Sequence, residues 1–215
     1  NYRHFNEIER KVGKHPKALL KSETNESDII VWCSNDYLGM SQNKLVINSM
    51  INSIKSTGTG SGGTRNISGN SSAIVNLENE LADLHSKERA LVFSSGYVAN
   101  ESTISTILTM LDDAIVFSDE KNHASIISGI KKTNNIKEIF KHNDKNHLET
   151  LIKKYPKHKP KVVIFESIYS MDGDFGDISG ISKIAKKYKA LTYLDEVHAV
   201  GMYGNKGSGV TEELG

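Results

Sequence analysis

Apolar residues recur at two spacings along the chain, and the two spacings alternate. Ile47, Met50, Ile51 and Ile54 follow one another every three or four residues, which predicts an amphipathic helix. The same spacing predicts helices within residues 74–84, 104–111, 148–155 and 181–188, the first of them after a polar start suited to an N-cap. Short apolar runs predict strands at 90–93, 114–117, 136–140, 162–165 and 190–194.

Alternating helices and strands are typical of an α/β fold built on a mostly parallel sheet. Functional side chains in such sheets gather at the carboxyl ends of the strands. Polar residues follow the predicted strands at 94–96, at 118–119, at 166–167, and at Asp195 with His198. We therefore expect a functional site along this edge of the sheet.

Composition narrows the class of protein. The chain has 215 residues, 37% hydrophobic and 25% charged, with a net charge of +1, which fits one large soluble domain and gives no bias toward nucleic acid or an anionic membrane. The single cysteine, Cys33, excludes an internal disulfide and fits a reducing compartment. It lies in the apolar run 29–33, so we expect a small buried side chain rather than a nucleophile.

No apolar run approaches the roughly 20 residues of a membrane span.

The two ends of the chain indicate a fragment. The first residue is Asn1 and not a methionine, so removal of an N-terminal targeting segment stays an alternative. At the other end, residues 211–215 have the sequence of a loop in the middle of a domain.

Residues 58–63 match the dinucleotide-binding pattern G-x-G-x-x-G. That fingerprint needs a strand before it and a helix directly after it, whereas a predicted helix precedes this match. We therefore reject NAD binding and expect a glycine loop that is flexible or lies close to a substrate.

Three polar motifs each have an ordinary and a functional interpretation. Residues 94–100 form a strand–turn–helix junction, which is either an ordinary turn with a glycine for steric relief or a phosphate site made by the N–H groups of Gly96 and Tyr97. His123 either caps a helix or stacks its ring on an aromatic cofactor. The sequence 172–174, Asp-Gly-Asp, fits a common turn, and its spacing does not continue into a calcium loop.

Asp195 is the strongest candidate for chemistry. It ends a predicted buried strand, and His198 follows three residues later. A carboxylate there would keep a pyridine nitrogen protonated, and the imidazole would reach the ring's phenolic oxygen, which points to pyridoxal 5′-phosphate (PLP) chemistry. Asp195, Glu196 and His198 could also suggest metal ligands, but no H-E-x-x-H helix accompanies them.

Together these motifs resemble the α-oxoamine synthases, PLP enzymes with the type I, aspartate-aminotransferase fold. The matching stretches occur in order at 2–5, 31–40, 60–69, 93–100, 122–125, 165–173 and 195–204. The resemblance implies a three-layer α/β/α large domain with a mostly parallel central sheet over residues 46–215. It also implies an N-terminal segment, residues 1–45, that contributes to substrate binding.

The resemblance implies a role for each matching residue. In the catalytic group, Asp195 would pair with the pyridinium nitrogen, His123 would stack on the ring, and His198 would contact the phenolic oxygen. Gly96, Tyr97 and Ser170 would complete the cofactor site, the first two through backbone N–H groups to the phosphate. The implied substrate-binding residues are Arg3, Asn35, Thr64, Asn66 and Ser118; among them, Arg3 would clamp a distal carboxylate.

Within that family the match is best to the branch that condenses glycine with succinyl-CoA to give 5-aminolevulinate, CoA and CO₂, the first step of tetrapyrrole and heme biosynthesis. The resemblance implies a homodimer with its active site at the interface, in a bacterial cytoplasm or a mitochondrial matrix. The family's imine-forming lysine and small domain lie after residue 215, so we expect the fragment alone to be inactive. The alternatives are a sister synthase (8-amino-7-oxononanoate synthase or 2-amino-3-ketobutyrate CoA ligase) and a non-catalytic relative.

Overall fold

A computed structural model describes residues 5–22 and 24–215, and the chain divides into two compact units. The first unit comprises Asn1–Asn70 and the second Ser71–Gly215. Each is described by itself. The expected division at residue 45 concerns which segment binds substrate, and it stays a prediction.

The first unit joins a small antiparallel sheet to one long helix. The sheet has the order β1-β2-β3, and the helix α1 begins after Asn43, whose side chain accepts a hydrogen bond from Leu45 N. No residue of α1 is buried. The elements are β1 (Glu7–Arg10), β2 (Lys17–Lys21), β3 (Glu26–Ile30), a 3₁₀ turn (Met40–Gln42), α1 (Lys44–Thr57) and a π-helical turn (Arg65–Gly69).

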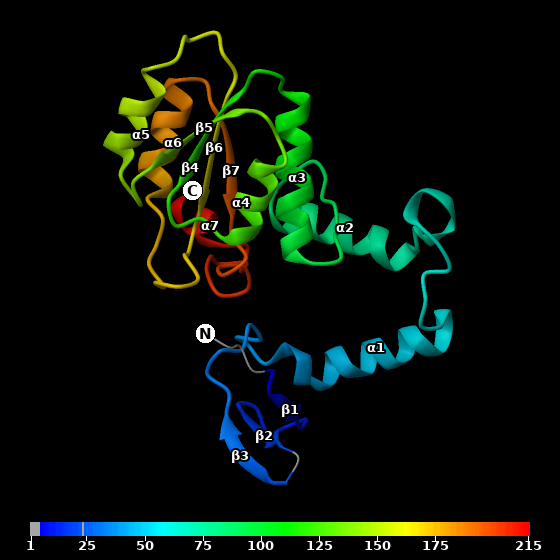
Figure 1. The fold of residues 1–215 in the computed structure, drawn as a ribbon. Helices are drawn as coiled ribbons and strands as arrows, with labels where there is room; N and C mark the ends of the chain where they lie inside the picture. The colour runs from blue at the N-terminus through cyan, green and yellow to red at the C-terminus, as the bar shows by residue number, and fades with distance from the viewer. Residues whose placement is uncertain (1–4, 23) are drawn as a thin grey trace. The chain divides into compact units, whose positions relative to one another are not determined.

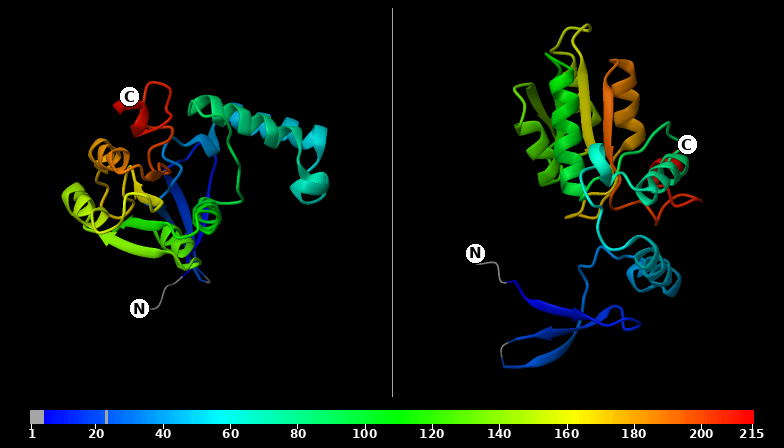
Figure 2. Two further views of the ribbon diagram at one scale, coloured as in Figure 1. Left: turned by 90° about the horizontal axis from the view of Figure 1, so that it is seen from above. Right: turned by 90° about the vertical axis from the view of Figure 1, so that its right-hand side faces the viewer.

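The second unit is a parallel four-stranded sheet between two layers of helices (Figures 1 and 2). This confirms the predicted α/β class. Its strands are β4 (Ile115–Asp119), β5 (Ile136–Phe140), β6 (Lys161–Glu166) and β7 (Leu191–Asp195). Its helices are α2 (Ser72–Leu84), α3 (Gly96–Met110), α4 (Ala124–Lys131), α5 (Lys145–Ile152), α6 (Ile178–Lys187) and α7 (Val210–Leu214).

The order of the strands places a switch point in the sheet. The order is β5-β4-β6-β7, so the chain leaves β4 toward β5 on one side and returns to β6 on the other. In open parallel sheets, ligands bind outside the carboxyl ends of the strands at such a reversal. Here that place is bordered by the ends of β4 and β6, Asp119 and Glu166.

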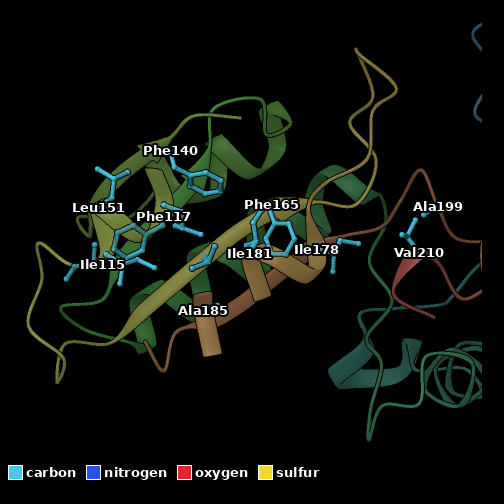
Figure 3. Close-up of a cluster of buried hydrophobic side chains, with 13 residues drawn as sticks. Ile115, Phe117, Phe140, Leu151, Phe165, Ile178, Ile181, Ala185, Ala199 and Val210 are labelled. Carbon is cyan, nitrogen blue, oxygen red and sulfur yellow. The ribbon is translucent and has the colours of Figure 1, made fainter. Parts of the chain in front are cut away.

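Separate apolar clusters cover the two faces of the sheet. On one face, α5 and α6 pack against β4 and β6, and Phe165 lies beside Ile178 and Ile181 (Figure 3). On the other face, α3 and α4 pack through Ile104 and Ile126. β4 and β6 are buried along their whole length, which is why their sequences read as continuous apolar runs.

Two expectations were wrong. Residues 90–93 do not pair as a strand, because Val92 N donates to the Glu78 side chain (2.7 Å) rather than to a neighbouring strand. Cys33 is exposed rather than buried, since β3 ends at Ile30 and the segment after it, with Trp32 90% exposed, leaves the small sheet. Among the described residues, no helix is long and apolar enough to cross a membrane.

Candidate functional site

Asp195 stands at the carboxyl end of β7 and is held there by side-chain and backbone donors. Its Oδ2 accepts a hydrogen bond from Asn100 Nδ2 of α3 at 2.7 Å, and its Oδ1 accepts one from Val197 N at 2.9 Å. Side chains alternate between the faces of a strand, so Tyr193 and Asp195 both face α3. Tyr193 accordingly donates its hydroxyl hydrogen to Asn100 Oδ1 at 2.8 Å.

Asn100 connects this carboxylate to the start of α4. It is 8% exposed, and its Nδ2 also donates to Ser125 Oγ at 3.0 Å. Ser125 Oγ in turn lies 2.7 Å from His123 Nδ1. The polar chain Asp195–Asn100–Ser125–His123 therefore links two candidate groups that are far apart in the sequence.

His123 is the N-cap of α4, as the ordinary interpretation predicted, and its Nδ1 accepts a hydrogen bond from Ser125 N at 3.2 Å. Its ring is exposed, and the ring of Tyr97 lies edge-on to it with 6.3 Å between centroids. Capping and stacking are compatible, because the cap uses the ring's edge and leaves its face available. The position is fixed further by His123 N, which donates to Glu166 Oε1 at 2.5 Å.

Glu166 is a buried carboxyl group at the switch point. Its side chain lies beside Asp195 in the register of β6 and β7. Burial, and then the charges of Asp195 and Asp119, raise the pKa of Glu166 to about 7, although the hydrogen bond from His123 N opposes this. The edge of the sheet thus carries a group that can gain or lose a proton near neutral pH.

The N-terminus of α3 offers backbone donors. Ser95 caps the helix by accepting a hydrogen bond from Val98 N at 3.2 Å. The N–H groups of Gly96 and Tyr97 precede the first intrahelical bond, and no described acceptor bonds to them. A Cβ on Gly96 would meet nothing within 4 Å, so the approach to these groups is open.

Ser170 and His198 lie in turns that follow β6 and β7. Ser170 is exposed in a hairpin whose arms meet at the bridge Ile168–Phe175. The Asp-Gly-Asp motif forms the predicted turn, with Gly173 at a φ of 72° and its N–H bonded to Tyr169 O. His198 is half-buried in the turn directly after Asp195.

The predicted substrate-binding residues are divided between the two units. Thr64 Oγ1 donates to Asn66 Oδ1 at 2.5 Å, and Asn35 is exposed, all within the first unit. Ser118 belongs to the second unit, where it is 1% exposed and accepts a hydrogen bond from Asn122 Nδ2. Arg3 lies outside the described residues.

A hollow of about 950 Å³ lies between the end of α2 and the helices α6 and α7. Phe165 and Leu194 line it, and they face away from the side of the sheet that carries Asp195. We therefore place the candidate site at the strand ends and not in this hollow. No group of histidine, cysteine or acidic side chains in the described part of the chain is arranged to hold a metal ion.

Sequence reasoning gave no role to Asn100 or to Glu166. A signal for Asn100 was present, because it shares the buried face of α3 with Ile104 and Leu108 at intervals of four residues. A polar residue on an apolar face needs a partner. Glu166 appeared only as a polar strand end, and its contact with His123 depends on tertiary structure.

Relatives of known function match the whole chain. It is 53% identical over 215 residues to 5-aminolevulinate synthase of Paracoccus denitrificans, covering 100% of this chain and 53% of the relative. It is 52% identical over 212 residues to the mitochondrial 5-aminolevulinate synthase of Saccharomyces cerevisiae, covering 99% of this chain and 38% of the relative. The chain thus spans about half the length, or less, of these curated relatives.

Solved structures share the fold. A serine palmitoyltransferase from S. paucimobilis, solved with PLP and myriocin bound, has a TM-score of 0.89 and 31% identity, covering 97% of this chain and 51% of its own. An 8-amino-7-oxononanoate synthase from Francisella tularensis has a TM-score of 0.67 and 27% identity, over 83% and 48% of the two chains. The profile of aminotransferase class I and II matches residues 27–213, and the chain belongs to that family.

Proposed function

We propose that the protein containing this chain is a PLP-dependent 5-aminolevulinate synthase, an acyltransferase that condenses glycine with succinyl-CoA to 5-aminolevulinate, CoA and CO₂. One observation of the structure supports the proposed binding of PLP most directly. The first turns of α3 offer free N–H groups at Gly96 and Tyr97, and four residues later Asn100 holds the Asp195 carboxylate.

The residues present fit PLP because the start of α3 offers an anion site, and Asn100, one turn further along the same helix, holds the Asp195 carboxylate of β7. Four residues of α-helix rise about 6 Å, a separation suited to a group with a phosphate at one end and a ring nitrogen at the other. The helix N-terminus favours the phosphate charge. Two donors keep Asp195 in place, so it would meet the pyridinium nitrogen without rearranging.

The other cofactor residues have supporting positions. His123 leaves its ring face exposed, which suits stacking on the cofactor. Ser170 and His198 follow β6 and β7 at the same edge, and they would contact the phenolic oxygen side of the ring. PLP supplies an electron sink for the charge that develops at the glycine α-carbon.

Substrate binding draws mainly on the first unit in this proposal. Arg3 would bind the distal carboxylate of succinyl-CoA as a bidentate donor. Asn35 would face the carboxylate of glycine, and Thr64 with Asn66 would lie beside the acyl group. Ser118, at the end of β4, is the proposed substrate-binding residue of the second unit.

The comparisons favour this member of the family over its sisters. Identity to the 5-aminolevulinate synthases is 53%, against 31% to serine palmitoyltransferase and 27% to 8-amino-7-oxononanoate synthase. Identity over the whole chain includes the segments that are proposed to bind substrate. The same relatives place such enzymes in bacteria and in mitochondria, and the compartment proposed here is the bacterial cytoplasm or the mitochondrial matrix.

We also propose a homodimer with the active site at its interface. Support comes from α1, whose apolar stripe predicts a buried face. In the isolated chain Met50 is 66% exposed, Ile51 43% and Ile54 40%. Sedimentation of the full-length protein should give twice the mass of one chain, and a monomer at micromolar concentration would contradict this part.

The function is tested by CoA release from the full-length protein with PLP. Succinyl-CoA, acetyl-CoA and pimeloyl-CoA are compared as donors, and glycine, alanine and serine as acceptors. Release confined to succinyl-CoA with glycine is expected. Release with another pair would assign a sister synthase, and no release with any pair would favour a non-catalytic relative.

A further inference from the structure

The loop after β6, residues 167–177, carries Ser170 and is here named the Ser170 loop. Within the loop, Tyr169 N bonds to Asp174 O at 3.1 Å and Gly176 N bonds to Ser167 O at 2.9 Å. Its tip is open to solvent, with Met171 92% exposed. A loop of this kind needs contacts with the rest of the unit to hold Ser170 at one place.

Those contacts converge on His142, the second residue after the end of β5. Its Nδ1 lies 2.9 Å from Asp119 Oδ1, at the end of β4, and its Nε2 lies 2.6 Å from Asp174 Oδ2, in the Ser170 loop. The His142 side chain is 12% exposed and that of Asp119 0%. The ring of Tyr169 packs against the imidazole, perpendicular to it at 4.4 Å between centroids.

The neighbouring residue Asn143 reinforces the same contact. Its Oδ1 accepts a hydrogen bond from Asp177 N at 2.9 Å, and its Nδ2 donates to Phe175 O at 2.9 Å. Its backbone N–H donates to Asp119 Oδ2 at 3.1 Å. His142 and Asn143 therefore bond the second arm of the loop, residues 174–177, to the end of β4, and the ring of Tyr169 in the first arm packs on the imidazole.

The two carboxylates beside the ring nitrogens favour the protonated form of His142. A neutral imidazole has one N–H donor and one lone pair, so it would turn a lone pair toward one of the carboxylates. Only the imidazolium donates to both. Asp174 Oδ2 also accepts a longer hydrogen bond from Asn143 Nδ2 at 3.4 Å, whereas its Oδ1 is buried and has no described partner.

We propose that protonated His142 is a positioning residue that clamps the Ser170 loop to the end of β4 and so sets Ser170 against the cofactor. The clamp itself is independent of the reaction, whereas the consequence for the cofactor rests on the proposed function. His142 lies outside every stretch of the sequence that resembles the family.

The surrounding charges favour the imidazolium. Burial alone would lower the pKa of His142, but the hydrogen bonds and charges of Asp174 and Asp119 outweigh it and raise the pKa. Other charged or titratable groups also face the clamp: Glu120, which accepts a hydrogen bond from His142 N, Glu166 of β6, Tyr169, and Lys121, which pairs with Asp172. A raised histidine pKa means that the clamp is complete at low pH and is lost as pH rises through the raised value.

The first test is hydrogen exchange of the full-length protein, read by mass spectrometry, in His142→Gln. Amides of the Ser170 loop should exchange at least about tenfold faster, because a charged hydrogen bond to the loop is lost. Amides of β4 and β6 should keep their protection. His158→Gln, at an exposed histidine before β6, is the matched control and should change nothing.

Asp174→Asn provides a second route if His142→Gln does not fold, and it should loosen the same loop. In the wild type, loop exchange corrected for the intrinsic rate should rise with pH, and the rise should disappear in both variants. Unchanged loop exchange in the variants, or equal loosening of β4 and β6, would overturn the clamp.

The link to the cofactor is tested by PLP affinity in His142→Gln, Ser170→Ala and the double variant. Both single changes should weaken binding, and the double variant should be no weaker than the worse single one, because the two residues act as one unit. Additive effects would overturn the positioning of Ser170. Absence of PLP binding in the wild type would contradict the proposed function. The hydrogen-exchange data would still show whether His142 clamps the Ser170 loop.

Discussion

Asn100 Nδ2 and Asp195 Oδ2 lie 2.7 Å apart and join the second turn of α3 to the end of β7 across 95 positions of sequence. The bond ties the helix that would bind the cofactor phosphate to the carboxylate that would bind the ring nitrogen. The geometry of the site therefore depends on how α3 packs against the sheet.

Replacement of Asp195 by asparagine should lower kcat of the full-length protein with PLP by at least about 100-fold. Unit charges about 4 Å apart at an effective dielectric near 20 attract by roughly 4 kcal/mol, or about three pKa units of the ring nitrogen. Steady-state CoA release measures the effect. Asp113→Asn, an exposed carboxylate paired with Lys159 at the opposite end of the sheet, is the control and should leave kcat unchanged.

Asn100→Ala should lower the free energy of unfolding by about 1–3 kcal/mol, because it leaves buried polar partners unpaired. It should also weaken PLP binding, since Asp195 loses one of its two donors. Urea unfolding and a PLP titration measure these quantities. Asn146→Ala, on the exposed face of α5, should affect neither, and equal effects of the two changes would count against the role of Asn100.

Glu166→Gln should remove a pH dependence of stability. Its pKa is raised from 4.5 to about 7 by burial first and by Asp195 next. The folded state therefore binds this proton more tightly than the unfolded state, and stability falls as pH rises between those two values. At pH 8 the Gln variant should be more stable than the wild type by up to about 3 kcal/mol.

The difference in urea unfolding between wild type and Glu166→Gln should shrink toward zero at pH 4. The exposed Glu88 provides a matched Glu→Gln control. A constant difference across the range would show that Glu166 does not titrate in the folded protein.

Phe117→Ala should lower the free energy of unfolding by about 3–5 kcal/mol, because the ring is 0% exposed in the centre of β4 and a cavity would remain. Phe175→Ala, where the ring is 49% exposed, should cost much less. Urea unfolding of the two variants in parallel checks the contrast. Similar costs at both sites would mean that the cluster around Phe117 does not form the core.

The sequence predicted the parts of the fold that depend on local periodicity. The helices α2, α3, α5 and α6 and the strands β4 to β7 coincide with apolar spacings, since each buries at least part of its apolar surface in the second unit. The spacing of apolar residues also predicted α1, although no residue of this helix is buried in the isolated chain. The antiparallel sheet of the first unit was not predicted, because β1 is exposed along its length and carries no apolar alternation. Residues 90–93 show the converse, since an apolar run forms a strand only where a neighbour pairs with it.

The candidate site was predictable only at the strand ends. Asp195 and His123 follow strands that were predicted and that form, and the parallel sheet brings such ends to one edge. Gly96 follows the predicted strand at 90–93, which does not form, and its place is set by the packing of α3 instead. Glu166 and His142 could not be assigned, because their roles depend on contacts with residues 43 and 23 positions away. A polar residue at the end of a strand predicts a place in the site, and only the tertiary contacts assign its partner.

The most direct test of the site is the protonation state of the PLP ring nitrogen in the full-length protein. With ¹⁵N in the pyridine ring, the nitrogen chemical shift of the wild type should report a protonated ring at pH 8, and Asp195→Asn should report a deprotonated one. A ring nitrogen that is deprotonated in the wild type, or that is unaffected by the substitution, would contradict the assignment of Asp195 and with it the placement of the cofactor at the ends of β4, β6 and β7.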